Sequence, residues 1–414
     1  MSEWKETKII DIADLNINSI NKNSKLNVIE YIDTSSVEQG QLINVQKINL
    51  KEAPSRAKRR IQENDILISS VRPNLKHYYF VRQCKENTVV STGFVVITPK
   101  KIVHPYFLYC LLTTNEYTQY LTQIANNHTS TYPSFNPDII ANSVLPIPEF
   151  KEQKQIADII SCLDNKIDNL RHQNETLETI AQTLFKHWFI DFEFPKDDGK
   201  PYKSSGGAMV ASELGDIPEG WRVGKLENFC TVFRGSSPRP ISSPVFFKNG
   251  NIPWIKIADA TRSNSIYLSE TREHCTEAAL PYTRLLKKGS LILSNSATIG
   301  VPMILNLEGC IHDGWLSFKD YKLITRNFLF FILVNKLSFL IQYADGSVQK
   351  NLNIGILNNM DFILPNLKII NKFTNFSQSI FDKILSNEKQ IQTLTKTRDT
   401  LLPKLMSGQI RVKD

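Results

Sequence analysis

The chain has 414 residues, which is too long for one ordinary domain and indicates two or more folded units. Its apolar share of 41% and charged share of 22% are near globular averages, which excludes a disordered or fibrous protein. The 49 lysine and arginine residues outnumber the 41 aspartate and glutamate residues, an excess that favours a polyanionic partner such as nucleic acid.

Cysteine usage and hydropathy indicate the compartment. The six cysteines are widely spaced and include no CxxC pair, which is typical of a reducing environment. The N-terminus lacks the pattern of a signal peptide, and the longest apolar run, residues 328–334, is far below the ~20 residues needed to cross a bilayer. We therefore expect a cytoplasmic protein.

Residues 1–147 contain short strand-like segments. Residues 65–69 and 89–98 are rich in β-branched side chains and are separated by glycine, proline, asparagine and serine. This pattern predicts a first domain of irregular α+β structure.

A long helix is predicted for residues 148–194. Apolar side chains recur at alternating spacings of four and three from Ile156 to Trp188, with Asn174 as the polar exception, which is typical of a coiled-coil seam. Pro148 and Pro195 bracket the segment. Residues 195–217, rich in glycine, serine, proline and charge, are predicted to be a linker or an exposed loop.

The second half of the chain repeats the first. Similar motifs return in the same order: residues 4–5 as 221–222, 65–69 as 290–294, 92–94 as 313–315, 107–108 as 328–329, and 135–136 as 352–353. The repeat predicts a second α+β domain over residues 218–364 and a second long helix over residues 365–414. Its seam runs from Phe373 to Leu405, and Pro403 is expected to kink or end the helix.

The two seams need partners, and the repeat favours antiparallel packing of one helix on the other. A register in which paired residue numbers sum to 561 sets Asn174 opposite Asn387, and a buried Asn pair fixes register at some cost in stability. The alternative is that each helix only covers its own domain. The expected fold class is α+β, with two tandem α/β domains related by pseudo-twofold symmetry and separated by two long antiparallel coiled-coil helices.

Motifs for catalysis are absent from the sequence. It contains no GxxxxGK[ST] phosphate loop, no glycine-rich cofactor loop and no Asn-Pro-Pro-Tyr motif for methyl transfer. Asp138, Glu149 and Lys151 fit the loose pattern of a Mg²⁺-dependent nuclease, but the second half carries Gly355 and Asn366 instead. A zinc set could also be imagined, although adjacent residues rarely ligate one tetrahedral ion; its members would be His274, Cys275, Cys310 and His312. We expect no catalytic residue and no bound metal.

Three stretches resemble the specificity subunit of Type I restriction-modification systems: residues 145–195, 201–221 and 397–412. The resemblance implies two target-recognition domains that each read one half of a bipartite DNA site, with the helices acting as a ruler. It also implies docking of two methyltransferase subunits, which methylate adenine N6, and of restriction and translocase subunits where the system has them. AdoMet, ATP and Mg²⁺ would be used by those partners. Two alternatives are a self-contained Mg²⁺-dependent nuclease and a coiled-coil scaffold that binds no DNA.

Candidate DNA contacts lie in basic and polar segments of each domain, because phosphates are neutralised by cations and bases are read by polar side chains. Those of the first domain are Arg56, Lys58, Arg59, Arg60, Ser69, Ser70, Arg72, Asn74, Lys76, His128, Ser130 and Tyr132. Those of the second domain are Arg234, Ser236, Ser237, Arg239, Asn295, Ser296, Thr298, Ser347, Gln349, Lys350 and Asn351. The sets differ in residue type, as expected for two unlike half-sites, and a plain turn or solvated face is the alternative for each residue.

Overall fold

The computed structural model describes residues 4–20, 24, 26–128, 132–263, 265–296, 298–345 and 351–412. Its contacts divide the chain into two compact units. Unit 1 comprises Met1–Asp168 and Gln392–Asp414, and unit 2 comprises Asn169–Ile391. Each unit therefore takes one part of its structure from each half of the sequence.

Unit 1 contains three main sheets and a small two-stranded hairpin among the described residues. In the first sheet, of order β6-β3-β10-β7, the central strands run parallel; the strands are β6 (Gln46–Asn49), β3 (Val28–Ile32), β10 (Thr88–Ser91) and β7 (Ala57–Arg60). The second sheet is antiparallel, with β2 (Ala13–Leu15), β11 (Phe94–Pro99), β8 (Ile66–Ser69) and β9 (Tyr78–Phe80). In the third, β1 (Lys5–Lys8) pairs with β12 (Val144–Ile147). A two-residue hairpin, β4 (Val37–Glu38) and β5 (Gln41–Leu42), lies beside them.

Unit 2 repeats this topology. The sheet β19-β17-β23-β20 again has a central parallel pair, and its strands are β19 (Glu273–Cys275), β17 (Ile252–Ile255), β23 (Gly309–Ile311) and β20 (Arg284–Leu286). The second sheet gains one strand: β16 (Thr231–Arg234), β24 (Trp315–Lys319), β21 (Leu291–Ser294), β22 (Pro302–Leu305) and β18 (Tyr267–Leu268). β15 (Arg222–Lys225) pairs with β25 (Asp361–Leu364), as β1 pairs with β12. The internal repeat inferred from the sequence is therefore also a repeat of topology.

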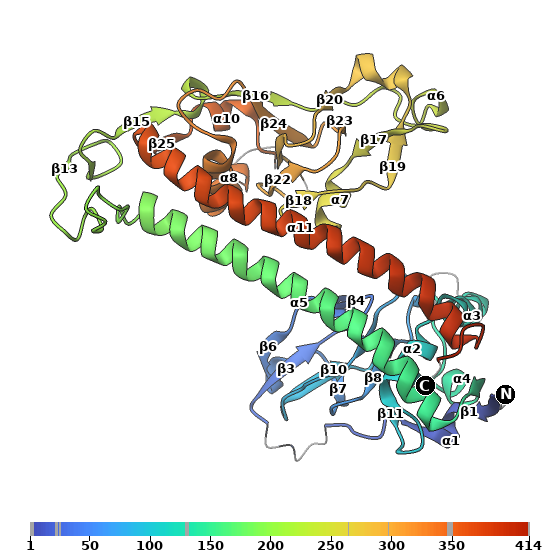
Figure 1. The fold of residues 1–414 in the computed structure, drawn as a ribbon. Coiled ribbons are helices and arrows are strands. Elements are labelled where there is room, and N and C mark those ends of the chain that lie inside the picture. The colour runs from blue at the N-terminus through green and yellow to red at the C-terminus, as the bar shows by residue number, and fades with distance from the viewer. Residues whose placement is uncertain are drawn as a thin grey trace. The chain divides into compact units, whose positions relative to one another are not determined.

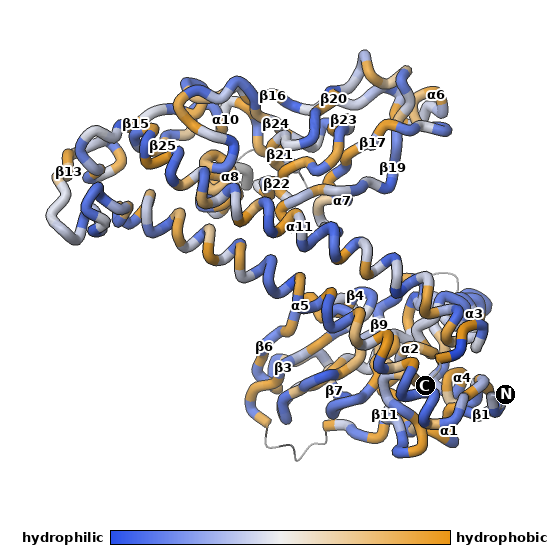
Figure 2. Tube along the Cα trace, in the orientation of Figure 1, coloured by the Kyte–Doolittle hydropathy of each residue, from blue (hydrophilic) through white to orange (hydrophobic). Residues whose placement is uncertain are grey.

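Two 40-residue helices, α5 (Phe150–Phe189) and α11 (Leu367–Met406), contribute to both units (Figure 1). Apolar and polar residues alternate along both (Figure 2). In unit 1, Ile156 and Ile160 of α5 share a buried core with Leu405 of α11. In unit 2, the rings of Trp188 and Phe373 lie 6.1 Å apart. In unit 2 the two helices therefore run antiparallel, since Asn387 also bonds to Asn174, and both pairs follow the expected sum of 561.

Proline 403 lies inside the last turn of α11, which continues to Met406. The helix thus ends within one turn of the proline, as expected for a residue whose ring conflicts with the preceding turn. Ser407 donates its backbone N–H to the carbonyl of Pro403 at 3.0 Å, which closes the helix.

The remaining helices are short and mostly cover the sheets. The α-helices among them are α1 (Ile9–Ile12), α2 (Pro105–Leu112), α3 (Asn115–His128), α4 (Asp138–Ala141), α6 (Pro244–Phe247), α7 (Ile257–Arg262), α8 (Arg326–Asn335), α9 (Leu337–Asp345) and α10 (Ile354–Asn358). The apolar segment noted in the sequence is α8, and its residues from Asn327 to Leu333 are buried in the core of unit 2. Within the described ranges, no helix is both long and apolar enough to traverse a membrane.

The segment between the repeats is folded onto unit 2. β13 (Met209–Val210) pairs with β14 (Ile217–Pro218). The ring of Phe194 stacks on those of Tyr202 and Trp221, with centroid distances of 4.5 and 4.9 Å. These aromatic contacts hold a segment that is otherwise largely exposed and polar.

Candidate nucleic-acid interface

The same three loops meet in both units. In unit 1, Ser70 donates its backbone N–H to the carbonyl of Gly93 at 2.8 Å, and its own carbonyl accepts from the N–H of Phe135 at 3.0 Å. In unit 2, Asn295 makes the equivalent bonds with Gly314 at 2.9 Å and with Leu352 at 2.9 Å. We call this arrangement the three-loop junction. Because backbone atoms make it, the side chains around it are free to differ between the units.

The junction of unit 1 displays an arginine and an aromatic ring. Arg72 adopts a left-handed backbone conformation (φ 47°) and donates its backbone N–H to the carbonyl of Pro133 at 2.8 Å. Its guanidinium lies 5.5 Å from the centroid of the exposed Tyr132 ring, within the range of a cation–π contact. Asn74 is exposed beside it, and Lys76 is tied to Asn115 at 2.7 Å.

Strand β7 carries the basic run of unit 1. Arg56, Lys58 and Arg60 are exposed around this strand, whereas Arg59 is half-buried, and burial lowers the pKa of Arg59. Arg56 forms an ion pair of 3.4 Å with Asp33, and Arg60 donates to the carbonyl of Glu86 at 3.0 Å. Alternation along the strand thus presents Lys58 and Arg60 on the solvent side, where they could meet phosphates.

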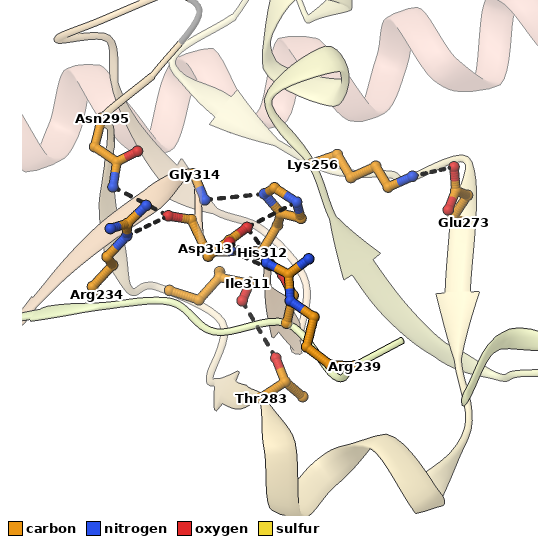
Figure 3. Close-up of polar contacts among 11 residues, drawn as sticks. Arg234, Arg239, Lys256, Glu273, Thr283, Asn295, Ile311, His312, Asp313 and Gly314 are labelled. Carbon is orange, nitrogen blue, oxygen red and sulfur yellow. Dashed lines mark hydrogen bonds and ion pairs between the residues drawn. The ribbon is translucent and has the colours of Figure 1, made fainter. Parts of the chain in front are cut away.

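In unit 2, four candidate residues converge on one aspartate that the sequence did not single out (Figure 3). Asp313 lies in the turn between β23 and β24, and its side chain accepts hydrogen bonds from Ser237 at 3.0 Å and Arg239 at 3.2 Å. Its carbonyl accepts from Arg234 Nε at 2.7 Å and from Asn295 Nδ2 at 3.2 Å. Residues from two separate segments, 234–239 and the end of β21, are therefore fixed around a single turn.

His312 completes this cluster. Its Nδ1 accepts the backbone N–H of Gly314 at 3.0 Å, so the ring proton is on Nε2, which lies 2.9 Å from Asp313 Oδ1. Burial lowers the pKa of His312, although Asp313 acts in the opposite direction. The imidazole is therefore neutral near pH 7 and donates to the aspartate without adding charge.

A glycine brings β16 close to this turn. A Cβ atom at Gly235 would lie 2.2 Å from the carbonyl oxygen of His312, so no larger residue fits. Next to it, Arg284 donates its Nε to the carbonyl of Arg234 at 2.8 Å, and its guanidinium lies 4.8 Å from the Phe233 ring. Arg234 also lines a cavity of about 450 Å³ that includes Asn351, a candidate from the sequence.

Two of the candidates are buried, and others are half-buried, exposed or outside the described residues. Ser69 and Asn295 are each only 1% exposed, and both hold loop backbone: Ser69 donates to the Val71 carbonyl at 2.8 Å. They followed strands in the sequence, but here the side chains turn inward and bond to the backbone of neighbouring loops. Ser236 and Ser296 are half-buried and Thr298 is exposed. Ser130, Ser347, Gln349, Lys350 and the side chain of His128 lie outside the described residues.

The metal sets considered from the sequence do not assemble in the described part of the chain. No group of three or more His, Cys, Asp or Glu side chains there could hold a metal ion. Cys275 is buried while its neighbour His274 is exposed, because successive side chains of β19 point to opposite faces. Asp138 and Glu149 are exposed at the starts of α4 and α5.

Comparisons with known proteins identify the family. The family model described as the Type I restriction modification DNA specificity domain matches residues 1–179 and again residues 218–401. The HindI specificity subunit of Haemophilus influenzae is 29% identical over an alignment of 467 residues that covers 99% of this chain and 100% of that protein. The MjaIX specificity subunit of Methanocaldococcus jannaschii is 30% identical over 347 residues, covering 81% of this chain and 76% of that protein.

A solved structure shares the fold. The crystal structure of the S subunit of a Type I restriction-modification system from M. genitalium is 13% identical and aligns with a TM-score of 0.57, covering 97% of this chain and 96% of that one. The relatives identify DNA specificity as the function, in place of the nuclease and the scaffold considered from the sequence. The chain belongs to the Type I restriction-modification DNA specificity family, whose members supply target recognition and leave catalysis to partner subunits.

Proposed function

We propose that each unit reads one half of a bipartite DNA target through its three-loop junction. The observation that carries this proposal is that one backbone arrangement presents different side chains in the two units. Unit 1 presents Arg72 and Tyr132, whereas unit 2 presents Arg234 and Arg239. A conserved frame with variable polar side chains is what a reader of two unlike half-sites requires, since base edges are distinguished by their donor and acceptor patterns.

Arg72 is the residue of unit 1 best placed to contact a base. Its backbone is held by Pro133, its guanidinium lies over Tyr132, and the side chain is exposed. A planar guanidinium held in this way can donate two hydrogen bonds to one guanine with little further loss of conformational freedom.

The test is to measure binding of the full chain, with its methyltransferase partner, to duplexes altered in either half-site. Arg72→Ala should lose roughly 5- to 100-fold in affinity for DNA carrying an intact first half-site. On DNA whose first half-site is altered, Arg72→Ala and the wild type should bind with the same affinity. Lys5→Ala removes an exposed cation from β1, outside the junction, and serves as the matched control. Equal loss on unrelated DNA would mean that Arg72 only neutralises phosphate, and no sequence preference at all would contradict the proposed function.

The partner subunits are proposed to bind in two copies. Phe150 of unit 1 and Leu367 of unit 2 stand at equivalent places of the repeat and are 48% and 47% exposed. Ile159 and Phe376 are likewise equivalent, at 36% and 39%. Exposed apolar side chains that recur at equivalent places suit two copies of one partner, and we assign them to contacts with the methyltransferase subunit. AdoMet, ATP and Mg²⁺ would then act in the methyltransferase and restriction or translocase subunits.

Light scattering of the assembled complex tests this stoichiometry. Phe150→Asp with Ile159→Asp should remove one methyltransferase subunit, and Leu367→Asp with Phe376→Asp should remove the other. Asp substitution at Ile102, which is 62% exposed in unit 1 and lies off the helices, is the control. Retention of two partner subunits by both double variants would place the docking surface elsewhere.

A further inference from the structure

Asp313 is an acidic side chain within a cationic surface. Arg234, Arg239 and Arg284 surround its turn, and the nearby Lys256 is paired with Glu273 at 2.6 Å. A carboxylate at a DNA interface is repelled by phosphates unless its charge is compensated. The Asp313 carboxylate therefore serves a purpose other than general affinity for DNA.

The bonds of Asp313 leave little capacity for direct base reading. One carboxylate oxygen, Oδ1, accepts from Ser237 and from His312, and the other, Oδ2, accepts from Arg239. Because Ser237 and neutral His312 carry no charge, Arg239 is the one ionic partner of the carboxylate among the residues that the structure describes. The aspartate is thus fixed by two neutral donors and aimed at one arginine.

Arg239 is suited to be the group that Asp313 holds. Its side chain is 71% exposed, yet one Nη2 N–H is bonded to Oδ2 at 3.2 Å. An ion pair this exposed contributes little to stability. It does, however, restrict the rotamers of a long side chain, and the end of the guanidinium that faces away from Asp313 keeps N–H groups on both Nη atoms.

Among its described residues, unit 1 has no ion pair at the positions equivalent to Asp313 and Arg239. The residue equivalent to Asp313 is Thr92, which donates its backbone N–H to the carbonyl of Arg56 at 2.8 Å. An acid–arginine pair exists there too, between Asp33 and Arg56, but it comes from different positions of the repeat. The Asp313–Arg239 pair is therefore a feature of unit 2 alone and not part of the common frame.

We propose that Asp313 is a positioning residue that holds Arg239 to read a guanine in the half-site bound by unit 2. Guanine is the base expected because its O6 and N7 are two acceptors that match the paired N–H groups of arginine in the major groove. This inference rests on the proposed DNA-reading function of unit 2. Arg239 is the residue that reads the base, and Asp313 is the residue that holds it in place.

The test selects bound duplexes from a pool with both half-sites randomised, using the full chain with its methyltransferase partner. The wild type should select guanine at one position of the second half-site. Arg239→Lys keeps the charge but loses the paired donors, so this position should become degenerate. Asp313→Asn should weaken the guanine preference at the same position. Combined with Arg239→Lys, it should weaken that preference little further. It should leave the salt dependence of binding unchanged. Asp313→Glu keeps the carboxylate and should therefore retain more of the guanine preference than Asp313→Asn does.

Two internal controls separate the possible failures. Glu273→Gln breaks a neighbouring ion pair with the same change of charge and should leave every base preference intact. The first half-site, read by unit 1, reports whether each variant still folds and binds. Unchanged guanine selection by Arg239→Lys, or by a folded Asp313→Asn, would overturn the inference while leaving the function in place. If the wild type selects no sequence, the proposed function itself fails.

Discussion

Arg398 of α11 donates a hydrogen bond to Asp164 of α5 at 2.9 Å, in the middle of the helix pair of unit 1. Arginine occupies a seam position where the heptad pattern calls for an apolar residue. Burial lowers the pKa of Arg398, but the bonds to Asp164 and Asp399 raise it by more, so the side chain remains charged. Asp164 also accepts from the hydroxyl of Tyr106 at 2.5 Å, which links the helix pair to α2.

Replacing Arg398 should destabilise unit 1. In Arg398→Met the half-buried Asp164 carboxylate loses its ionic partner, and the free energy of unfolding should fall by about 2 kcal/mol. Adding Asp164→Asn should recover part of the loss because the uncompensated charge is removed. Urea unfolding measures both.

Asp399→Asn provides the matched control for this pair. Asp399 bonds to the same arginine but is itself 58% exposed, so its replacement should change the free energy of unfolding by less than about 0.5 kcal/mol. Equal effects of Asp399→Asn and Arg398→Met would show that burial of the Asp164 contact is unimportant.

The asparagine pair of unit 2 should fix the register of the two helices at some cost in stability. Asn387 donates to Asn174 at 2.8 Å, and Asn174 donates to Glu388 at 2.8 Å, with both asparagines buried. Asn387→Leu alone leaves the Asn174 oxygen without this donor and should cost about 1–3 kcal/mol. The double variant Asn174→Leu, Asn387→Leu should be more stable than either single variant. A double variant less stable than both would show that the pair contributes net stability.

The stability of unit 2 should fall as the pH rises from about 4.5 to about 7. Burial, with the nearby Glu388 and Glu175, raises the pKa of Glu178 from 4.5 to about 7. Since the folded-state pKa lies above the unfolded value, this contribution to stability is complete below pH 4.5 and is lost as the pH rises to about 7. Glu178→Gln should flatten the dependence of the melting temperature on pH between 5 and 8.

Glu270 allows this pH effect to be assigned. It is an exposed carboxylate of unit 2 outside the helix pair, so Glu270→Gln should retain the wild-type pH profile. A profile that is flat in the wild type, or unchanged in Glu178→Gln, would contradict the assignment to Glu178.

Lys58 on β7 should contribute affinity without specificity. It is exposed on the basic strand of unit 1, and a phosphate contact releases counterions on binding. Lys58→Ala should weaken binding to all duplexes to a similar extent and should reduce the slope of log K against log salt by about 0.9. A loss confined to one sequence would instead make Lys58 a base contact.

The repeat and the helix register could be predicted because both depend on spacing along the chain. The sum of 561 followed from matching polar and apolar positions, and the structure pairs Asn174 with Asn387 and Trp188 with Phe373. The partner of Arg398 could not be predicted in this way. Asp164 is not a seam residue, and its role depends on how α2 packs against the helix pair.

The Asp313 cluster could not be predicted from local patterns. The sequence pointed to Arg234, Ser237, Arg239 and Asn295 separately, but their convergence depends on how β16, β21 and β24 lie in one sheet. One signal was present: the repeat aligns Asp313 with Thr92, and a change from hydroxyl to carboxylate within an otherwise matched turn marks a place where the two halves differ.

The sharing of helix segments has a consequence for the integrity of the chain. The C-terminal part of α5 is buried in the core of unit 2, and the C-terminal part of α11 is buried in the core of unit 1. A cut in the exposed stretch near residues 212–216 would therefore not release the two fragments, because each is anchored by side chains buried among those of the other. Separately produced halves should reconstitute the protein by noncovalent complementation.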